Sequence, residues 1–349
     1  MGNKLRTITQ IRNLSMIDIT VAICTYNGEK RLPDVLERLR TQINIEPISW
    51  EIVVIDNNST DDTVKIIQKY QSDWPKAYPI QYYFEPEQGL AFARQRAVKE
   101  AKGTLVGFLD DDNLPTPNWV AEAYAFVQAH PKAGAYGSKI SGEFEVEPPE
   151  NFKRISPFLA IGGGKKALCY TSSDYKHSYK RVLPPGAGLV IRKEAWLESV
   201  PERLVFQGRV GASLVAAEDI EALLHIRKAG WEIWYNPEMH IYHQIQKQRL
   251  EREYLMNLMR GIGLGRHHTR MLGFKGWQRP LVFPVYMAND LRKIILHFIK
   301  YRTVLKTDVV AACEMELLLG SIISPFYMGK QYLLSVNKKL NPIEKLQVE

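Results

Sequence analysis

The sequence has little cysteine. Cys24, Cys169 and Cys313 are the only three among 349 residues, and they are far apart. An odd number at this spacing excludes a disulfide framework and a cysteine-based zinc site. The protein is therefore expected in a reducing compartment, the cytoplasm.

Low-complexity tracts and a long apolar run near the N-terminus are also missing. The first twenty residues, MGNKLRTITQIRNLSMIDIT, have no continuous apolar core of the kind that a secretory signal needs. Their Met-Gly-Asn start resembles a myristoylation motif only in part, because Arg6 stands where Ser or Thr is required. With 45% hydrophobic and 24% charged residues, the chain is neither disordered nor collagen-like nor a coiled coil. One large or two smaller globular domains are expected.

The positive charge is concentrated near the C-terminus. The formal net charge is +8, and residues 247–349 contain 17 of the 46 Lys and Arg but only 8 of the 38 Asp and Glu. The first 246 residues are close to neutral. This asymmetry indicates a negatively charged partner, either anionic lipid or nucleic acid. No nucleic-acid recognition motif accompanies it, so a nucleic-acid partner is not expected.

Strand and helix patterns alternate over the first 140 residues. Short apolar, β-branched runs predict strands at residues 19–24, 51–56, 80–84 and 104–109. Helical patterns predict helices at residues 32–43, 61–70 and 89–102. This order predicts an α/β fold in which helices flank a parallel sheet.

The pattern changes beyond residue 140. Residues 141–185 are rich in Gly, Pro, Ser and Lys, which predicts a long loop. Regular elements return with a strand at 188–192, a helix at 219–229 and a strand at 232–235. From about residue 250 onward only helical patterns occur.

Acidic residues stand where predicted strands end. Asp56 ends the second strand, Asp110–Asp112 end the fourth, and a Glu-Asp pair opens the helix at 219–229. Ligands of an open α/β sheet bind at the carboxyl ends of its strands, so these side chains are candidates for one site. Three adjacent carboxylates repel one another unless a cation neutralises them, and Mg²⁺ or Mn²⁺ bridging a diphosphate would do so. The alternative is an acidic turn that caps the next helix.

A nucleoside pocket is predicted beside the first strand. That strand leads into Thr25, Tyr26 and Asn27, and Asp56 ends the neighbouring strand, from which its carboxylate would reach a base or ribose. Asp at a strand end also commonly caps a turn, which is the alternative. Arg94 is a candidate for neutralising phosphate, although an arginine on a helix is by default solvated.

Five segments, in this order, resemble the inverting family 2 glycosyltransferases of the GT-A fold. They are VAICTYNGEKRLPDVLERL at 21–39, EIVVIDNNSTDDT at 51–63, EQGLAFARQRAVKEAKGTLVGFLDDDNLPTPNWV at 87–120, GAGLVIRKEAW at 186–196 and AEDIEALLHIRKAGW at 217–231. The resemblance implies a Rossmann-like GT-A fold with a mixed, mainly parallel sheet flanked by helices. It implies a catalytic domain over residues 17–245 and a basic helical extension over residues 246–349. Within the family, the chain is similar to bacterial exopolysaccharide enzymes of the cyanobacterial hormogonium-polysaccharide type.

The resemblance also implies the reaction. A sugar would move with inversion from a nucleoside diphosphate sugar, UDP-sugar by preference, to a saccharide or lipid-linked saccharide acceptor. Asp219 would act as the general base, supported by Glu218, and a divalent ion, Mn²⁺ or Mg²⁺, would stabilise the leaving diphosphate.

Further roles follow from the same resemblance. Asp110 and Asp112 take the first and last positions of the DxD motif, and Asp112 is the expected metal ligand, with Asp110 beside it. Because Asp111 also occupies the middle position, the assignment within the triplet stays open. The residues expected to bind nucleotide are Thr25, Tyr26, Asn27, Asp56, Arg94, Asp110 and Asp111. The residues expected at the sugar and acceptor are Gly186, Ala187, Gly188 and Trp234.

Two histidines follow the segment WEIWYNPEM. The family often has a histidine here that contacts metal or diphosphate, and His243 is the candidate, with packing under the C-terminal helices as the alternative. Trp234 could equally pack in the core. Arg249 could reach phosphate, but a solvated helix face is its default position.

Two apolar segments stand near the C-terminus. Residues 281–300 combine apolar groups with three basic residues, which fits an interfacial helix on an anionic membrane surface. Residues 308–328 are more apolar, but Glu314 and Glu316 near their middle argue against a membrane-spanning helix. Packing on the catalytic domain or on a second subunit of a homo-oligomer is the alternative for both.

Two rival functions remain. A nucleotidyltransferase of similar fold would need a Gly-rich basic loop after the first strand, and CTYNGEKR supplies a single Gly. A catalytically inactive scaffold that binds nucleotide or sugar in a polysaccharide assembly complex would not need an intact Asp112 and Asp219.

Overall fold

The structure is a computed structural model that describes residues 17–171, 183–208, 215 and 217–340. In these residues one sheet contains nine strands. In chain order they are β1 (Ile19–Thr25), β2 (Trp50–Asp56), β3 (Ile80–Phe84), β4 (Leu105–Asp110), β5 (Asn113–Pro115), β6 (Ala133–Phe144), β7 (Leu168–Cys169), β8 (Val190–Arg192) and β9 (Glu232–Ile245).

The sheet is mixed and mainly parallel, as predicted. Its spatial order is β3-β2-β1-β4-β8-β6-β9-β5, with β7 paired to β9. Strands β3, β2, β1 and β4 form a parallel block, β6 and β9 are parallel to each other, and β5, β7 and β8 pair antiparallel with their neighbours. The carboxyl ends of β1, β2 and β4 therefore meet at one edge, which is where ligands of such sheets bind.

Helices cover both faces of the sheet. Those of the N-terminal two thirds are α1 (Leu32–Arg40), α2 (Thr63–Ser72), α3 (Leu90–Glu100), α4 (Trp119–Ala129), α5 (Lys193–Ser199) and α6 (Glu218–Lys228). Helices α1, α2 and α4 bury apolar residues against one face, in the same core cluster as Val21 and Ile23 of β1. Helices α3, α5 and α6 cover the other face, where their apolar residues pack in one cluster with Ala22 and Cys24 of β1. This alternation follows from the two-residue period of a strand.

The segment predicted as one long loop, residues 141–185, is partly structured. Strand β6 extends into it as far as Phe144, and η1 (Phe152–Arg154), η2 (Ser156–Leu159) and β7 follow; residues 172–182 lie outside the described part. The predicted strand at 232–235 is likewise longer and runs to Ile245, because β9 pairs with β6 along most of its length. Pairing between distant segments thus extends strands whose own sequences give little signal.

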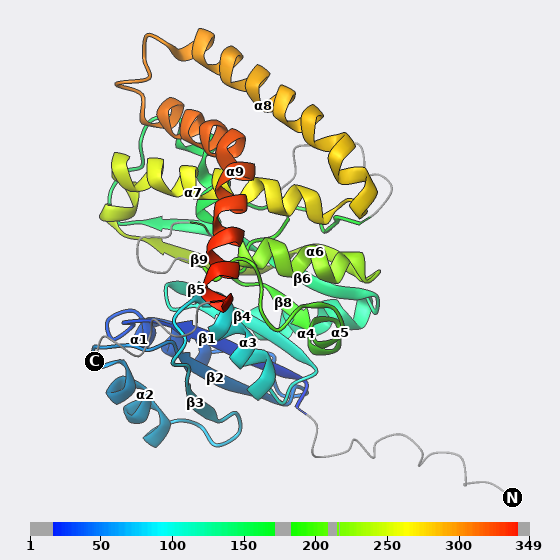
Figure 1. The fold of residues 1–349 in the computed structure, drawn as a ribbon. Helices are drawn as coiled ribbons and strands as arrows, with labels where there is room; N and C mark the ends of the chain where they lie inside the picture. Colours follow the sequence, from blue (N-terminus) through cyan, green and yellow to red (C-terminus); the bar gives the residue numbers. More distant parts are fainter. Residues whose placement is uncertain (1–16, 172–182, 209–214, 216, 341–349) are drawn as a thin grey trace, which may run out of the picture.

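The C-terminal region is helical, as predicted. It contains η4 (Lys247–Leu250), α7 (Arg252–Leu272), η5 (Gly276–Gln278), α8 (Arg279–Tyr301) and α9 (Val309–Leu340). Helices α7 and α9 cross closely at Gly263 and Gly320, where a Cβ on either glycine would lie 2.6 Å from a carbonyl oxygen of the other helix. Figure 1 shows α8 as the outermost helix, beyond α7 and α9.

Helix α9 contains a stretch that is long and apolar enough to cross a membrane by length and composition alone. It covers Val309–Leu333, has a mean hydropathy of 1.6 and is half buried inside the protein. Its two acids have partners: Glu314 pairs with Arg154, and Glu316 pairs with Arg260 of α7. The N-terminal part of α9 is thus tied to the rest of the chain by ion pairs as well as by apolar packing.

Candidate active site

A cavity of about 2280 Å³ opens at the carboxyl edge of the parallel strands. Thr25 and Tyr26 line it at the end of β1, and the Asp110–Asp112 triplet lines it at the end of β4. Gly186, Ala187 and the first turn of α6 form other parts of the wall. The acidic triplet and the Glu218–Asp219 pair thus line one cavity, whereas Asp56 does not.

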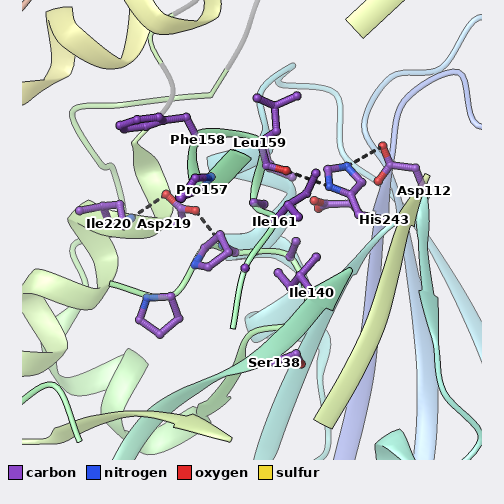
Figure 2. A pocket seen from close by; sticks show the side chains of 18 of the residues that line it. Asp112, Ser138, Ile140, Pro157, Phe158, Leu159, Ile161, Asp219, Ile220 and His243 are labelled. Atoms are coloured by element: carbon purple, nitrogen blue, oxygen red, sulfur yellow. Dashed lines mark hydrogen bonds and ion pairs between the residues drawn. The ribbon is translucent and has the colours of Figure 1, made fainter. Parts of the chain in front are cut away.

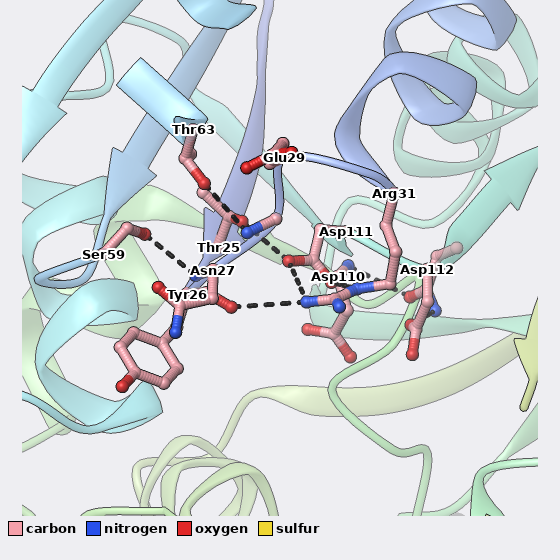
Figure 3. Close-up of polar contacts among 12 residues, drawn as sticks. Thr25, Tyr26, Asn27, Glu29, Arg31, Ser59, Thr63, Asp110, Asp111 and Asp112 are labelled. Atoms are coloured by element: carbon pink, nitrogen blue, oxygen red, sulfur yellow. Dashed lines mark hydrogen bonds and ion pairs between the residues drawn. The ribbon is translucent and has the colours of Figure 1, made fainter. Parts of the chain in front are cut away.

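Asp111, the middle residue of the triplet, is held by groups from β1 and the turn after it (Figure 3). The Thr25 hydroxyl donates to Asp111 Oδ2 at 2.6 Å, and Arg31 donates to both carboxylate oxygens at 2.9 and 3.0 Å. Burial raises the pKa of Asp111, and the bonds from Arg31 and Thr25 oppose that rise. This two-pronged arginine–carboxylate pair is strong and directional. Asp111 therefore fixes the turn after β1 against β4.

Asp112 lies against His243 of β9, as Figure 2 shows, and against Arg249 of η4. The Nη1 atom of Arg249 is 2.9 Å from both Asp112 Oδ2 and His243 Nε2, and Nε2 is 3.4 Å from the same carboxylate oxygen. His243 Nδ1 lies 3.1 Å from the Leu159 carbonyl oxygen. A carbonyl only accepts, so Nδ1 carries a proton and Nε2 is the nitrogen that faces Arg249 and Asp112. Burial pushes the pKa of Asp112 up, but the contacts with His243 and the charge of Arg249 outweigh it and hold that pKa below its ordinary value.

These side chains fit a divalent cation. The guanidinium of Arg249, itself a cation, lies where Asp112 and His243 converge, and its Nε atom is buried without a hydrogen-bond partner. A carboxylate and an imidazole whose other nitrogen donates to a carbonyl are common ligands of Mn²⁺ and related ions. In the described ranges no three His, Cys, Asp or Glu side chains are grouped to hold a metal. An ion here would have to take its other ligands from a bound diphosphate or from water.

Asp110 and Glu218 share the buried Arg94. Arg94 Nη2 is 3.5 Å from Asp110 Oδ1, and Nη1 donates to Glu218 Oε1 at 3.3 Å. Burial alone would lower the pKa of Arg94, but the charges of the surrounding carboxylates raise it. A Cβ on Gly186 would lie 2.3 Å from Arg94 Nη2, so a glycine is needed to leave room for the guanidinium. Arg94, predicted to meet phosphate, lines the cavity with its charge shared between two carboxylates.

Asp219 faces the cavity from the first turn of α6 (Figure 2). The Gly186 N–H donates to Asp219 Oδ2 and the Ile220 N–H donates to Oδ1, both at 2.7 Å. The helix N-terminus also favours a negative charge at this position. Each carboxylate oxygen keeps a further lone pair. Asp219 is therefore held in place and still able to accept a proton from a hydroxyl group in the cavity.

Two of the predicted nucleotide-binding residues stabilise turns next to the cavity and do not line it. Asp56 is buried and accepts hydrogen bonds from a backbone N–H of the next turn at 2.9 Å and from the Tyr82 hydroxyl at 3.1 Å. Asn27, with a φ of 51°, accepts from the Thr60 N–H at 2.8 Å. Tyr26 is exposed on the cavity wall.

Two of the predicted sugar and acceptor residues also lie off the cavity wall. Trp234 packs beside Phe126 and His130, with ring centroids at 6.0 and 4.4 Å. Gly188 adopts a φ of 65°, and a Cβ there would lie 2.7 Å from the Ser138 hydroxyl. Their observed contacts support the sheet and the 186–188 turn.

Two arginines at the site differ from the sequence interpretation. Arg249 is not on a solvated face, because Asp112 and His243 hold it at the cavity. Arg31 was not singled out. A signal for it existed, since it follows the turn after the first strand and so lies at the same edge as the acidic triplet.

Comparison with known proteins gives one family and several distant relatives. Residues 20–193 match the family described as glycosyl transferase family 2. Over 242 residues the chain is 22% identical to the glucosyl-dolichyl phosphate glucuronosyltransferase of Haloferax volcanii. This alignment covers 68% of this chain and 72% of that protein. Over 162 residues it is 30% identical to the poly(ribitol-phosphate) β-N-acetylglucosaminyltransferase TarS of Staphylococcus aureus. That alignment covers 46% of this chain but only 27% of TarS.

The fold also has solved neighbours. The mannosyltransferase PcManGT of Pyrobaculum calidifontis, solved with GDP-Man and Mn²⁺, aligns with a TM-score of 0.57 at 17% identity. The alignment covers 89% of this chain and 88% of that one. It shows that the two chains share the GT-A fold.

Proposed function

Since the chain carries a glycosyltransferase family 2 domain on a GT-A fold, and is thus a glycosyltransferase, we propose that it performs a metal-dependent, inverting sugar transfer. The donor is a nucleoside diphosphate sugar, with a UDP-sugar favoured, and the acceptor is a saccharide or lipid-linked saccharide of an extracellular polysaccharide. The observation that carries the proposal is that Asp219 and the Asp112–His243 pair line the same cavity.

The donor half of the site consists of Thr25, Tyr26 and the acidic triplet. The exposed ring of Tyr26 is available to the nucleoside, and Arg31 and Arg249 supply positive charge toward the diphosphate. Asp112 and His243 would hold the divalent ion, with Asp110 beside them. When bound, that ion neutralises charge on the leaving diphosphate. The fold neighbour named with GDP-Man and Mn²⁺ is in keeping with this chemistry.

The chemical step depends on Asp219. Its carboxylate takes the proton of the acceptor hydroxyl as that oxygen bonds to the anomeric carbon. The bond from this carbon to the diphosphate breaks on the opposite face, and its electron pair leaves with the nucleotide. The N–H groups of residues 186 and 220 orient the base, and Glu218 holds Arg94 behind it. Such general-base catalysis contributes about 10²–10⁴-fold to the rate.

A thermal-shift panel tests the donor proposal. The full chain is heated with UDP, GDP, dTDP or CDP, each with and without Mn²⁺. A ligand at about a hundred times its Kd stabilises the folded state by about 2.7 kcal/mol. We expect the UDP and Mn²⁺ pair to raise the midpoint by a few degrees and either component alone to raise it less.

The panel also separates the rival functions. A larger shift with another nucleotide would correct the base but keep the donor class. A shift with metal and nucleotide but no sugar release from any donor would favour the inactive scaffold. No shift with any of the four pairs would contradict the proposed donor site.

We further propose that α8 rests on an anionic membrane surface, where a lipid-linked acceptor would be found. Its exposed residues include Leu281, Val285, Leu296 and Ile299. At 100° per residue these four lie within a sector of about 60° of the helix circumference. Basic side chains accompany them on α8, and Asp290 is its one buried residue. An apolar stripe with adjoining positive charge suits anionic lipid.

Vesicle sedimentation checks this contact. We expect the full chain to sediment with vesicles containing phosphatidylglycerol and less with phosphatidylcholine alone, because each basic residue near an anionic surface adds about 1 kcal/mol. The double variant Leu296→Ser, Ile299→Ser should bind about tenfold more weakly, whereas Leu197→Ser, an equally exposed residue on α5, should bind normally. Loss of dimerisation in the double variant without any vesicle binding would instead identify α8 as a contact between two copies.

A further inference from the structure

One wall of the cavity is formed by α7, far from the acidic triplet in sequence. The α7 residues that line it recur every three or four positions, apart from one adjacent pair, so one side of the helix is turned to the cavity. They are Tyr254, Leu258, Ile262, Gly265, Arg266 and Thr269. The first three are apolar or aromatic, and a single charged side chain, Arg266, follows them.

The cavity has further apolar lining residues. They are Phe158, Ile161 and Ile220, and the first two pack in the same cluster as Leu258 of α7. Figure 2 shows Phe158 and Ile220 beside Asp219, and Ile161 between Asp219 and His243. The cavity thus combines a polar region around the triplet with an apolar region that begins at the proposed base. A nucleoside diphosphate sugar has no apolar part that would need this second region.

Arg266 lacks a counterion within the described part of the chain. Among the described residues, its guanidinium makes one hydrogen bond, from Nη1 to the Ser321 hydroxyl at 3.3 Å. The nearby acid, Asp290, is buried and already paired through both oxygens with Arg270 at 2.5 and 3.0 Å. Burial and the charge of Arg270 lower the pKa of Arg266 to about 10, which still leaves it charged at neutral pH. The same crowding lowers the pKa of Lys293, chiefly by burial and then by the charge of Arg266.

The helix that carries this positive charge contacts α6, the helix that carries the proposed base. A Cβ on Gly265, the residue before Arg266, would be 3.6 Å from the side chain of Ala217, which immediately precedes the Glu218–Asp219 pair. One turn further along α7, His268 is 3.0 Å from Glu221 of α6. Helix α7 is therefore packed against α6, and Arg266 lines the same cavity as Asp219. A half-buried cation without an acidic partner is costly, and an anion in the cavity would offset that cost.

We propose that the α7 side of the cavity binds the acceptor as an amphiphilic phosphate, with the phosphate on Arg266 and the hydrocarbon chain along the apolar walls. This inference rests on the proposed function, because it gives the acceptor hydroxyl at Asp219 a carrier of defined chemistry. Lys293 and Arg270 add positive charge beside the phosphate. The apolar lining selects a lipid phosphate over free inorganic phosphate.

Calorimetric titration of the full chain with three probes tests this inference: farnesyl phosphate, farnesol and inorganic phosphate. We expect farnesyl phosphate to bind at least about tenfold more tightly than farnesol, since a charge-assisted hydrogen bond replaces a neutral contact. Inorganic phosphate should bind weakest. Equal affinity for farnesyl phosphate and inorganic phosphate would overturn the lipid part of the inference and leave a plain anion site.

Variants locate the phosphate. Arg266→Gln should weaken farnesyl phosphate binding at least about tenfold and leave farnesol binding unchanged, and Arg266→Lys should restore most of the loss. The control Arg260→Gln, on the same helix but paired with Glu316 and off the cavity wall, should bind like the parent. Farnesyl phosphate binding that is equal in the parent and in a folded Arg266→Gln variant would overturn the assignment.

Nucleotide shifts separate this inference from the proposed function. The nucleotide-dependent midpoint shift should be the same in Arg266→Gln as in the parent, because Arg266 is remote from the donor half. Arg266-dependent binding of farnesyl phosphate in a chain that binds no nucleotide would refute the proposed transfer and keep the lipid phosphate site. Nucleotide binding without any Arg266-dependent phosphate binding would do the reverse.

Discussion

The substitution Asp219→Asn is expected to lower kcat by about 10²–10⁴-fold and to leave the binding of nucleotide with metal unchanged. Asn keeps the size of the side chain but cannot accept a proton at neutral pH. Asp219 lies on the α6 side of the cavity, whereas Asp112 and His243 are the proposed metal ligands and Arg249 the proposed diphosphate contact. Donor binding and chemistry are therefore carried by different side chains, and the variant should separate them.

The substitution has a structural cost that must be measured alongside the rate. Asp219 accepts one backbone N–H on each oxygen, and Asn can present an oxygen to only one of them. Facing its amide against the other N–H should lower the free energy of unfolding by about 1 kcal/mol. Thermal denaturation of the variant and of the parent checks that both are folded at the assay temperature, so that a lower kcat is not caused by unfolding.

A matched carboxylate provides the control for this test. Asp62→Asn removes an exposed carboxylate near the start of α2, away from the cavity wall, where its partner is the exposed Lys65. It should have normal kcat and nearly normal stability, because exposed pairs contribute little. Full transfer activity in Asp219→Asn would remove Asp219 as the base, and weakened nucleotide binding in that variant would mean that it serves the donor instead.

The parallel half of the fold could be predicted from the sequence because each of its strands is recognisable from its own residues. The runs ITVAIC and EIVVID are buried on both faces, so they consist of continuous apolar, β-branched residues bounded by turn residues. The observed β1 and β2 differ from their predicted bounds by one residue at one end. Their carboxyl ends necessarily share an edge, which is why the acidic residues could be assigned to one site in advance.

The other half of the sheet could not be read in the same way. Strand β6 contains Gly134 and Gly137, which lower its strand propensity. A Cβ on Gly134 would lie 2.5 Å from Trp231, and one on Gly137 would lie 2.3 Å from Pro184. These glycines are required by contacts with residues far along the chain. A local sequence pattern does not indicate such contacts.

The charge partners within the site were also beyond the sequence. Asp111 pairs with Arg31 over a separation of 80 residues, and Asp112 pairs with Arg249 over 137. Composition indicates that cations are available but not which carboxylate each one meets. The structure therefore distinguishes the three aspartates where the motif alone could not: Asp111 holds a turn, Asp110 meets Arg94, and Asp112 meets His243 and Arg249.

That distinction leads to an expected loss of metal binding in two variants. Asp112→Asn and His243→Ala should each weaken Mn²⁺ binding by at least about tenfold, because each removes a proposed ligand. Both should also abolish the part of the nucleotide-dependent midpoint shift that requires Mn²⁺. Titration of Mn²⁺ followed by electron paramagnetic resonance measures the first effect directly, without any assay of transfer. His240→Ala is the matched control, since that ring contacts the Ser141 hydroxyl at 2.9 Å and does not line the cavity.

Arg249 makes the same test sharper because its removal should act in the opposite direction. Its guanidinium contacts both proposed ligands, so a metal ion has to displace it. Arg249→Gln should therefore bind Mn²⁺ more tightly than the parent without nucleotide, yet bind UDP more weakly once the metal is present, since a cation near the diphosphate is lost. Unchanged Mn²⁺ affinity in all three variants would mean that the ion, if one is used, is held elsewhere. Tighter Mn²⁺ binding in Arg249→Gln alongside the losses in the other two would identify Asp112 and His243 as the ligands for which Arg249 and the metal compete.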